Sequence, residues 1–132
     1  MATLDLNGSN ITLPDGSFFN GASYLNGTDN VINNGGALAT LTEGGGPSGN
    51  TYSGTIFDGS HAVAITQTSG YVNFAGINTY SGGTNLLGGT VGVGASQFPN
   101  GDHQGFAAGL GTGVLTMSNG TTLQDTNGNI IV

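Results

Sequence analysis

The sequence predicts an all-β fold of stacked coils, a β-solenoid, and three observations support this prediction. A pentapeptide occurs twice without change, as Asn50–Gly54 and Asn78–Gly82. Short apolar pairs recur with one residue between their members, which places both side chains on one face of a strand. Glycine-bearing turns separate these pairs. Because such short strands cannot bury their apolar faces alone, a repeated unit of this kind must stack on its neighbours.

The N-terminal segment predicts two strands joined by a turn. Leu4 and Leu6 form the first inward pair, and Ile11 and Leu13 form the second. Asn7-Gly8 between them suits a corner between coils, but Asn-Gly is equally a signal for a two-residue hairpin. The local sequence leaves both arrangements open.

The next segments are less regular. Pro14–Gly16 predicts a turn, since proline presets φ and glycine accepts positive φ. We expect one looser coil over Ser17–Asn34, where the apolar residues follow no clean period. A strand is predicted over Ala37–Leu41, and an exposed loop over Glu43–Gly49.

The central and C-terminal segments return to the regular pattern. The inward pairs expected there are Val63/Ile65, Val72/Phe74 and Val91/Val93. Ala95–Gly109 interrupts the coils and predicts a loop insertion on one face. Strands are then expected over Val114–Met117, Thr121–Leu123 and Asn129–Val132. The whole chain, 1–132, is predicted to be one domain of about five to seven coils of roughly 20 residues each.

Composition excludes several classes of function. The chain has no Lys or Arg and a formal charge of −7, so nucleic acid and anionic membranes are not expected partners. Without cysteine, no disulfide or thiolate metal site can form. No apolar run reaches the length of a membrane-spanning helix, and Met1–Thr3 lacks the features of a signal peptide. We expect an excised segment or a chain whose export signal was removed.

The acidic and imidazole side chains do not predict an enzyme. The carboxylates are about ten or more residues apart, at Asp5, Asp15, Asp29, Glu43, Asp58, Asp102 and Asp125. A glycosidase needs two carboxylates facing each other, and a metal site needs converging ligands. We therefore expect solvated corner carboxylates, with no catalytic residue, metal or cofactor. His61, after a turn, is expected to stand at the entry of a strand.

The insertion is the candidate ligand-binding segment, because insertions in one repeat often form a binding face. Its candidate residues are Asn100, Asp102, His103 and Gln104. Asp102-His103 also has the composition of a metal ligand or general base, but no serine, cysteine or further ligand accompanies it. The favoured interpretation is that Asp102 and His103 are exposed polar residues of a loop, neither a metal ligand nor a general base.

A family resemblance rests on several of these motifs. The matching segments are Thr3–Gly8, Tyr52–Ile56, Asp58–Gly59, Ala64–Gly70, Asn78–Thr84, Gly88–Val91, Leu110–Met117 and Asn119–Leu123. Together they resemble the autotransporter-associated β-strand repeat of bacterial surface proteins. The resemblance implies a right-handed parallel β-helix displayed outside a Gram-negative cell. Gln67 departs from it, standing where the family often has lysine, and Asn100–Gln104 lies in an insertion that the repeat does not need.

The resulting functional prediction is a structural, extracellular or cell-surface β-solenoid, either a passenger segment or a fibre subunit. Stacked side chains at Asn50, Tyr52, Asn78 and Tyr80 are expected to form a ladder, with sugar stacking on the tyrosines as the alternative. The last coil resembles the first, so the ends are expected to join copies of the chain or adjacent coils of a longer one. The residues expected at these ends are Leu4, Leu6, Ile11, Leu123, Ile130 and Val132. The alternative function is an adhesin-type module that binds a carbohydrate, such as an extracellular polysaccharide, or a host surface.

Overall fold

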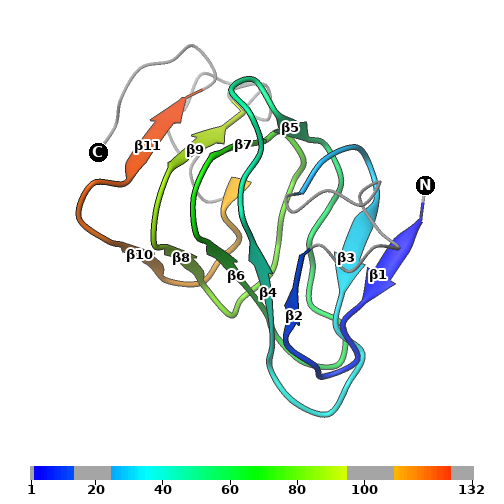
Figure 1. Cartoon of the computed structure of the whole chain (residues 1–132). Coiled ribbons are helices and arrows are strands. Elements are labelled where there is room, and N and C mark those ends of the chain that lie inside the picture. Colours follow the sequence, from blue (N-terminus) through cyan, green and yellow to red (C-terminus); the bar gives the residue numbers. More distant parts are fainter. Residues whose placement is uncertain (1, 14–24, 95–108, 126–132) are drawn as a thin grey trace.

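The computed structural model describes residues 2–13, 25–94 and 109–125, and Figure 1 shows the strands that these residues form. The strands are β1 Thr3–Asp5, β2 Ile11–Thr12, β3 Asn30–Ile32, β4 Ala39–Glu43, β5 Thr51–Tyr52, β6 Val63–Gln67, β7 Tyr71–Phe74, β8 Thr84–Leu86, β9 Thr90–Val93, β10 Leu115–Met117 and β11 Thr122–Asp125. The fold is therefore all-β, as the sequence predicts. The insertion residues 95–108 and the expected strand 129–132 lie outside the described residues.

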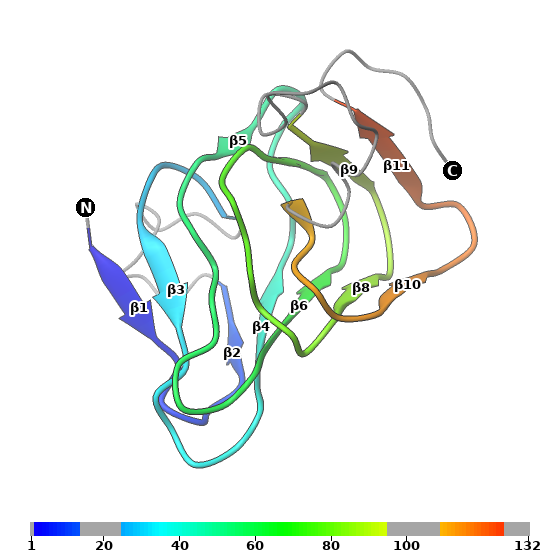
Figure 2. The ribbon, with the colours of Figure 1, turned by 180° about the vertical axis from the view of Figure 1, so that it is seen from behind.

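The strands form three sheets in which every paired strand is parallel to its partner. The orders are β1-β3, β10-β8-β6-β4-β2 and β11-β9-β7-β5. From β4 to β11 the chain alternates between the five-stranded and the four-stranded sheet. Figures 1 and 2 show β1 at one end of the structure and β11 at the other.

The turn after β1 is a corner and not a hairpin. Asn7 and Gly8 have φ of 48° and 76°, in the left-handed region that suits a tight turn. However, β1 pairs with β3, and β2 pairs with β4. The hairpin alternative was therefore wrong, because the chain leaves one sheet and enters another at this corner.

The chain returns to a given sheet after variable lengths. From Ile65 to its partner Thr84 is 19 residues, whereas from Thr84 to its partner Leu115 is 31. The longer return contains Ala95–Gly109, the segment that the sequence marks as an insertion. The spacing of roughly 20 residues thus holds for the central strands only.

The apolar pairs of the central strands face one shared core. β6 alternates buried and partly exposed residues, and the predicted pairs Val63/Ile65, Val72/Phe74 and Val91/Val93 are all 3% exposed or less. Both larger sheets contribute to a single hydrophobic cluster. Burial of apolar area between the sheets stabilises the fold by roughly 25 cal/mol per Å². The predicted inward pairs are confirmed.

Glu43 contradicts the sequence prediction. The expected strand ended at Leu41, and an exposed loop was to begin at Glu43. Instead β4 extends through Glu43, whose side chain is 1% exposed. Alternate residues of β4 point inward, and β6 pairs with β4 along its whole length as far as Gln67. The ladder therefore carries this carboxyl into the interior.

One buried asparagine joins three successive passes of the chain. Asn33 is fully buried, and its Oδ1 accepts hydrogen bonds from the N–H groups of Gly8 and Gly35 at 2.8 and 3.1 Å. Its Nδ2 donates to the carbonyl oxygens of Ala37 and Ala62 at 2.8 and 2.9 Å. Both polar atoms are fully satisfied, so the corner is held without another backbone ladder.

We expect Asn33→Ala to lower the free energy of unfolding by about 3 kcal/mol, because it removes four hydrogen bonds of a fully buried side chain to partly buried backbone groups. Urea unfolding followed by circular dichroism measures this change. Asn34→Ala is the matched control: Asn34 is exposed and donates from Nδ2 to Asp5 Oδ2 at 3.1 Å. Its loss should stay below about 1 kcal/mol, and equal losses in the two variants would contradict the role given to Asn33.

Candidate functional site

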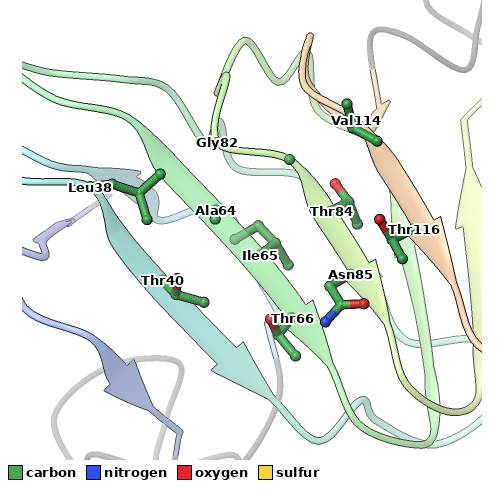
Figure 3. A pocket seen from close by; sticks show the side chains of 11 residues that line it. Leu38, Thr40, Ala64, Ile65, Thr66, Gly82, Thr84, Asn85, Val114 and Thr116 are labelled. Atoms are coloured by element: carbon green, nitrogen blue, oxygen red, sulfur yellow. The ribbon is translucent and has the colours of Figure 1, made fainter.

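A groove lies on the outer face of the five-stranded sheet, across β4, β6, β8 and β10 (Figure 3). Its volume is about 310 Å³. We call it the sheet groove and define it by Thr40, Thr66, Asn85 and Thr116 with Leu38 and Val114. Parallel sheets are usually covered on both faces. An outer face that is hollowed and open to solvent is therefore the first candidate for a binding surface.

A column of short polar side chains runs across this face. The register places Thr12 beside Thr42, Thr42 beside Thr66, Thr66 beside Asn85, and Asn85 beside Thr116. Each strand of the sheet thus contributes one residue, at the spacing of about 4.8 Å between neighbouring strands. The column is a regular array of hydroxyl, methyl and amide groups.

Glycines and exposed aliphatic residues shape the groove. A Cβ on Gly82 would lie 2.4 Å from the carbonyl oxygen of Val63, so the close backbone approach requires glycine there. Gly83 has φ of 95°. Leu38 and Val114 also line the groove and are 52% and 77% exposed. The surface therefore offers hydroxyl and apolar contacts together.

The sheet groove is suited to binding and not to proton transfer. None of its lining residues is charged or has a titratable side chain. Within the described residues, no group of three or more His, Asp or Glu side chains is arranged to hold a metal ion.

Across the same residues, no helix has the length and apolar character needed to cross a membrane.

The tyrosines predicted to form a ladder do not lie opposite each other. Tyr52 is in register with Phe74, and the two rings meet edge to face with centroids 6.1 Å apart. On its other side Tyr52 bridges to Gly27. Tyr80 is also buried, and its hydroxyl pairs with Thr84 Oγ1 at 2.5 Å. Because both rings are buried, neither offers an exposed face for sugar stacking.

The two asparagines of the repeated pentapeptide bond to the backbone of neighbouring passes instead of to each other. Asn50 Nδ2 donates to the carbonyl oxygen of Leu25 at 2.8 Å. Asn78 Oδ1 accepts from the N–H of Ile56, and its Nδ2 donates to the carbonyl oxygen of Gly109, both at 2.7 Å. These residues thus join passes, although by a different contact from the predicted ladder.

The residues expected at the joining ends divide into two groups. Leu4, Leu6 and Leu123 are at most 4% exposed, and Ile11 packs partly buried against the same core. Ile130 and Val132 lie outside the described residues, as do the predicted ligand-binding residues Asn100, Asp102, His103 and Gln104.

Asp5 and His61 are both exposed to solvent, as the sequence predicts. Asp5 is exposed, and hydrogen bonds from the N–H groups of Asn34 and Asn7 lower the pKa of its carboxyl. His61 is exposed two residues before β6, and its Nδ1 lies 2.7 Å from the carbonyl oxygen of Gly35. Asp29, Asp58 and Asp125 are only partly exposed, Asp125 as the last residue of β11, and Glu43 is buried.

Glu43 and Gln67 form a buried polar pair that the sequence analysis did not identify. They are register partners on β4 and β6, and both are at most 1% exposed. Glu43 Oε2 accepts from the N–H of Leu25 at 2.7 Å. Burial raises the pKa of the Glu43 carboxyl to about 7, although the Leu25 bond lowers it. A period-two pattern extended through Thr42 would have placed Glu43 inward.

Comparisons of the chain with protein-family models, with curated proteins and with solved structures found no match.

The pKa of Glu43 predicts a loss of stability as the pH rises. The unfolded chain releases this proton near pH 4.5 and the folded chain near pH 7, so stability is greatest below about 4.5 and declines until about 7. The decline should total about 3 kcal/mol. Urea unfolding at pH 4 and pH 8 measures it, and Glu43→Gln should remove it.

Asp5→Asn serves as the control for this measurement, because the pKa of Asp5 is shifted downward and its removal should leave the decline in place. Parallel pH profiles for the unmodified chain and Glu43→Gln would contradict the assignment to Glu43.

Proposed function

We propose that this protein is a structural β-solenoid, a rigid right-handed parallel β-helix of about five to seven coils. It would act outside the cell or on a bacterial outer surface, as a rod segment of an autotransporter-type passenger or as a fibre subunit. The observation that carries the proposal is the uninterrupted parallel register across five strands of one sheet and four of another. We assign it no enzymatic activity, cofactor, nucleic-acid partner or membrane insertion.

The physical basis of the rod is the repetition of the same contact. Each pass of the chain donates and accepts backbone hydrogen bonds with the passes on either side, and its apolar residues join the shared core. Stacking of this kind gives stiffness along the stack, because every strand is fixed by its neighbours. The absence of Lys and Arg also removes every trypsin cleavage site.

The ends of the two larger sheets support growth by addition. β2 and β10 are the edge strands of the five-stranded sheet, and β11 is an edge strand of the other. Proteins commonly protect such edges with lysine, and this chain has none. Contact between unlike ends does not close on itself and yields a filament. The partner at these ends is then a second copy, or an adjacent coil of a longer chain.

We expect the purified chain to form filaments visible by negative-stain electron microscopy. Lysine at both edges, as Thr12→Lys with Gln124→Lys, should reduce filament length strongly because charge opposes edge pairing. The control pair Ile77→Lys with Leu87→Lys changes the charge equally at residues that are 58% and 51% exposed and lie outside the strands. Monodisperse small particles from the unmodified chain would contradict assembly of the isolated chain.

An adhesin-type binding module is the second candidate, and the sheet groove favours it. Its uncharged lining and regular hydroxyls suit a neutral, hydroxyl-rich polymer such as an extracellular polysaccharide. A chain of net charge −7 would repel polyanions, so a neutral glycan is the favoured class. The groove and the rod are compatible, since the groove lies on the flank of the sheet.

We expect the combined variant Thr40→Val, Thr66→Val and Thr116→Val to lose retention on insoluble cellulose or β-glucan, because valine keeps the shape but removes the hydroxyls. The control Thr3→Val with Thr79→Val alters exposed threonines outside the groove. Pull-down at fixed protein concentration provides the measurement. Equal retention of both variants, or none by the unmodified chain, would contradict glycan binding at this face.

A further inference from the structure

Two oxygen atoms in the core are acceptors without a donor. Among the described residues, neither Glu43 Oε1 nor Gln67 Oε1 has a hydrogen-bond partner, and both are buried. An unsatisfied buried acceptor costs roughly 1–3 kcal/mol. Two such atoms on register partners require an explanation, because β4 and β6 form the longest strand pair of the structure.

The other atoms of both side chains fix their orientation. Gln67 Nε2 donates toward the carbonyl oxygens of Ser69, Gly70 and Thr90, at 3.0, 3.3 and 3.2 Å. Exchanging its oxygen and nitrogen would place an oxygen against three carbonyls, so the amide oxygen must be Oε1. Glu43 Oε2 is likewise fixed by the N–H of Leu25. The two remaining oxygens belong to neighbouring strands about 4.8 Å apart.

The surroundings supply no counter-ion for a carboxylate. The chain has no Lys or Arg. On β2 and the residue that follows it, Ile11, Thr12 and Leu13 carry no titratable group. The titratable groups that interact with Glu43 are Tyr52 and Tyr80, whose pKa values are raised chiefly by burial and further by the Glu43 charge.

A tyrosine is neutral or negative and never a cation, and Asp29, which acts on Tyr52, is an acid. Among the described residues no cation contributes to the pKa of Glu43, so a charged Glu43 would be buried there without a counter-ion.

We propose that, below neutral pH, Glu43 is a neutral carboxylic acid in the folded protein and that its Oε1–H donates a hydrogen bond to Gln67 Oε1. This single proton gives both unpaired oxygens a hydrogen-bond partner, and the bond links β4 to β6 at their C-terminal ends. Folding takes up this proton from solvent, and its release leaves a carboxylate facing an amide oxygen. The contact is thus a pH-dependent hydrogen bond between two strands of the core. The inference does not depend on whether the protein serves as a rod or as a glycan-binding module.

A single labelled residue can test this bond, because Glu43 is the only glutamate in the chain. Selective ¹³Cδ labelling of glutamate gives one carboxyl resonance, which can be followed from pH 4 to pH 9 in the folded protein and in urea. We expect a midpoint near pH 7 when folded and near 4.5 in urea. A folded midpoint near 4.5 would overturn the proposal.

The same samples test whether Gln67 accepts the proposed hydrogen bond. The side-chain amide of Gln67 should shift with the same midpoint as Glu43, and Glu43→Gln should abolish that shift. The side-chain amide of Gln124, which lies 3.5 Å from the Tyr71 hydroxyl, is the internal control and should not follow this titration. If Glu43 titrates near pH 7 while Gln67 remains unchanged, the acid is neutral but the bond between the two strands is refuted.

Discussion

Parallel hydrogen bonding between distant passes of the chain is the interaction on which the structure depends. Each strand is only two to five residues long and finds its partners on strands many residues away. Among the described strands, no pair is joined by a hairpin, so each pass is positioned by the passes beside it. The register of the strand pairs therefore determines which side chains are buried and which are exposed. A shift of one residue would exchange the buried and exposed faces of a strand.

The same register places a chemically different surface on each side of the sheet. Inside, it brings the Glu43 carboxyl and the Gln67 amide side by side in the interior, where both side chains are at most 1% exposed. Outside, it aligns Thr42, Thr66 and Asn85 into an uncharged column. The inner pair links the fold to pH, whereas the outer column offers hydroxyl groups to solvent or to a ligand. Both arise from one backbone arrangement.

Corners depend on polar side chains where the ladder is interrupted. Asn33 and Asn78 are almost fully buried and bond to backbone groups on neighbouring passes. Asparagine suits this place because its amide carries two donors and an acceptor on a short side chain. A chain rich in Asn and Gly can thus turn between sheets without leaving buried backbone groups unpaired.

The sequence was sufficient to predict strand type and facing, because apolar pairs such as Val63/Ile65 and Val72/Phe74 state directly which side is buried. It could not predict long-range alignment. The identical pentapeptides suggested that Tyr52 and Tyr80 are equivalent, yet Tyr52 is in register with Phe74. Local identity does not determine which residues become neighbours when the returns differ in length.

The candidate sites were harder to predict for the same reason. Glu43 precedes a run of glycines and has the composition of a loop residue, but pairing with β6 extends β4 to include it. The column of short polar side chains has no local sequence signature, since its members come from five strands that are far apart in the sequence. Only the register of the strands brings these residues together, and this register cannot be predicted from a single sequence.

The stacking of the five-stranded sheet can be measured directly by double electron–electron resonance. The chain has no cysteine, so Thr12→Cys and Thr116→Cys allow spin labels on the two edge strands alone. Four intervals between strands predict a narrow distribution centred at about 20 Å. A broad distribution, or one centred beyond about 30 Å, would contradict the parallel stack.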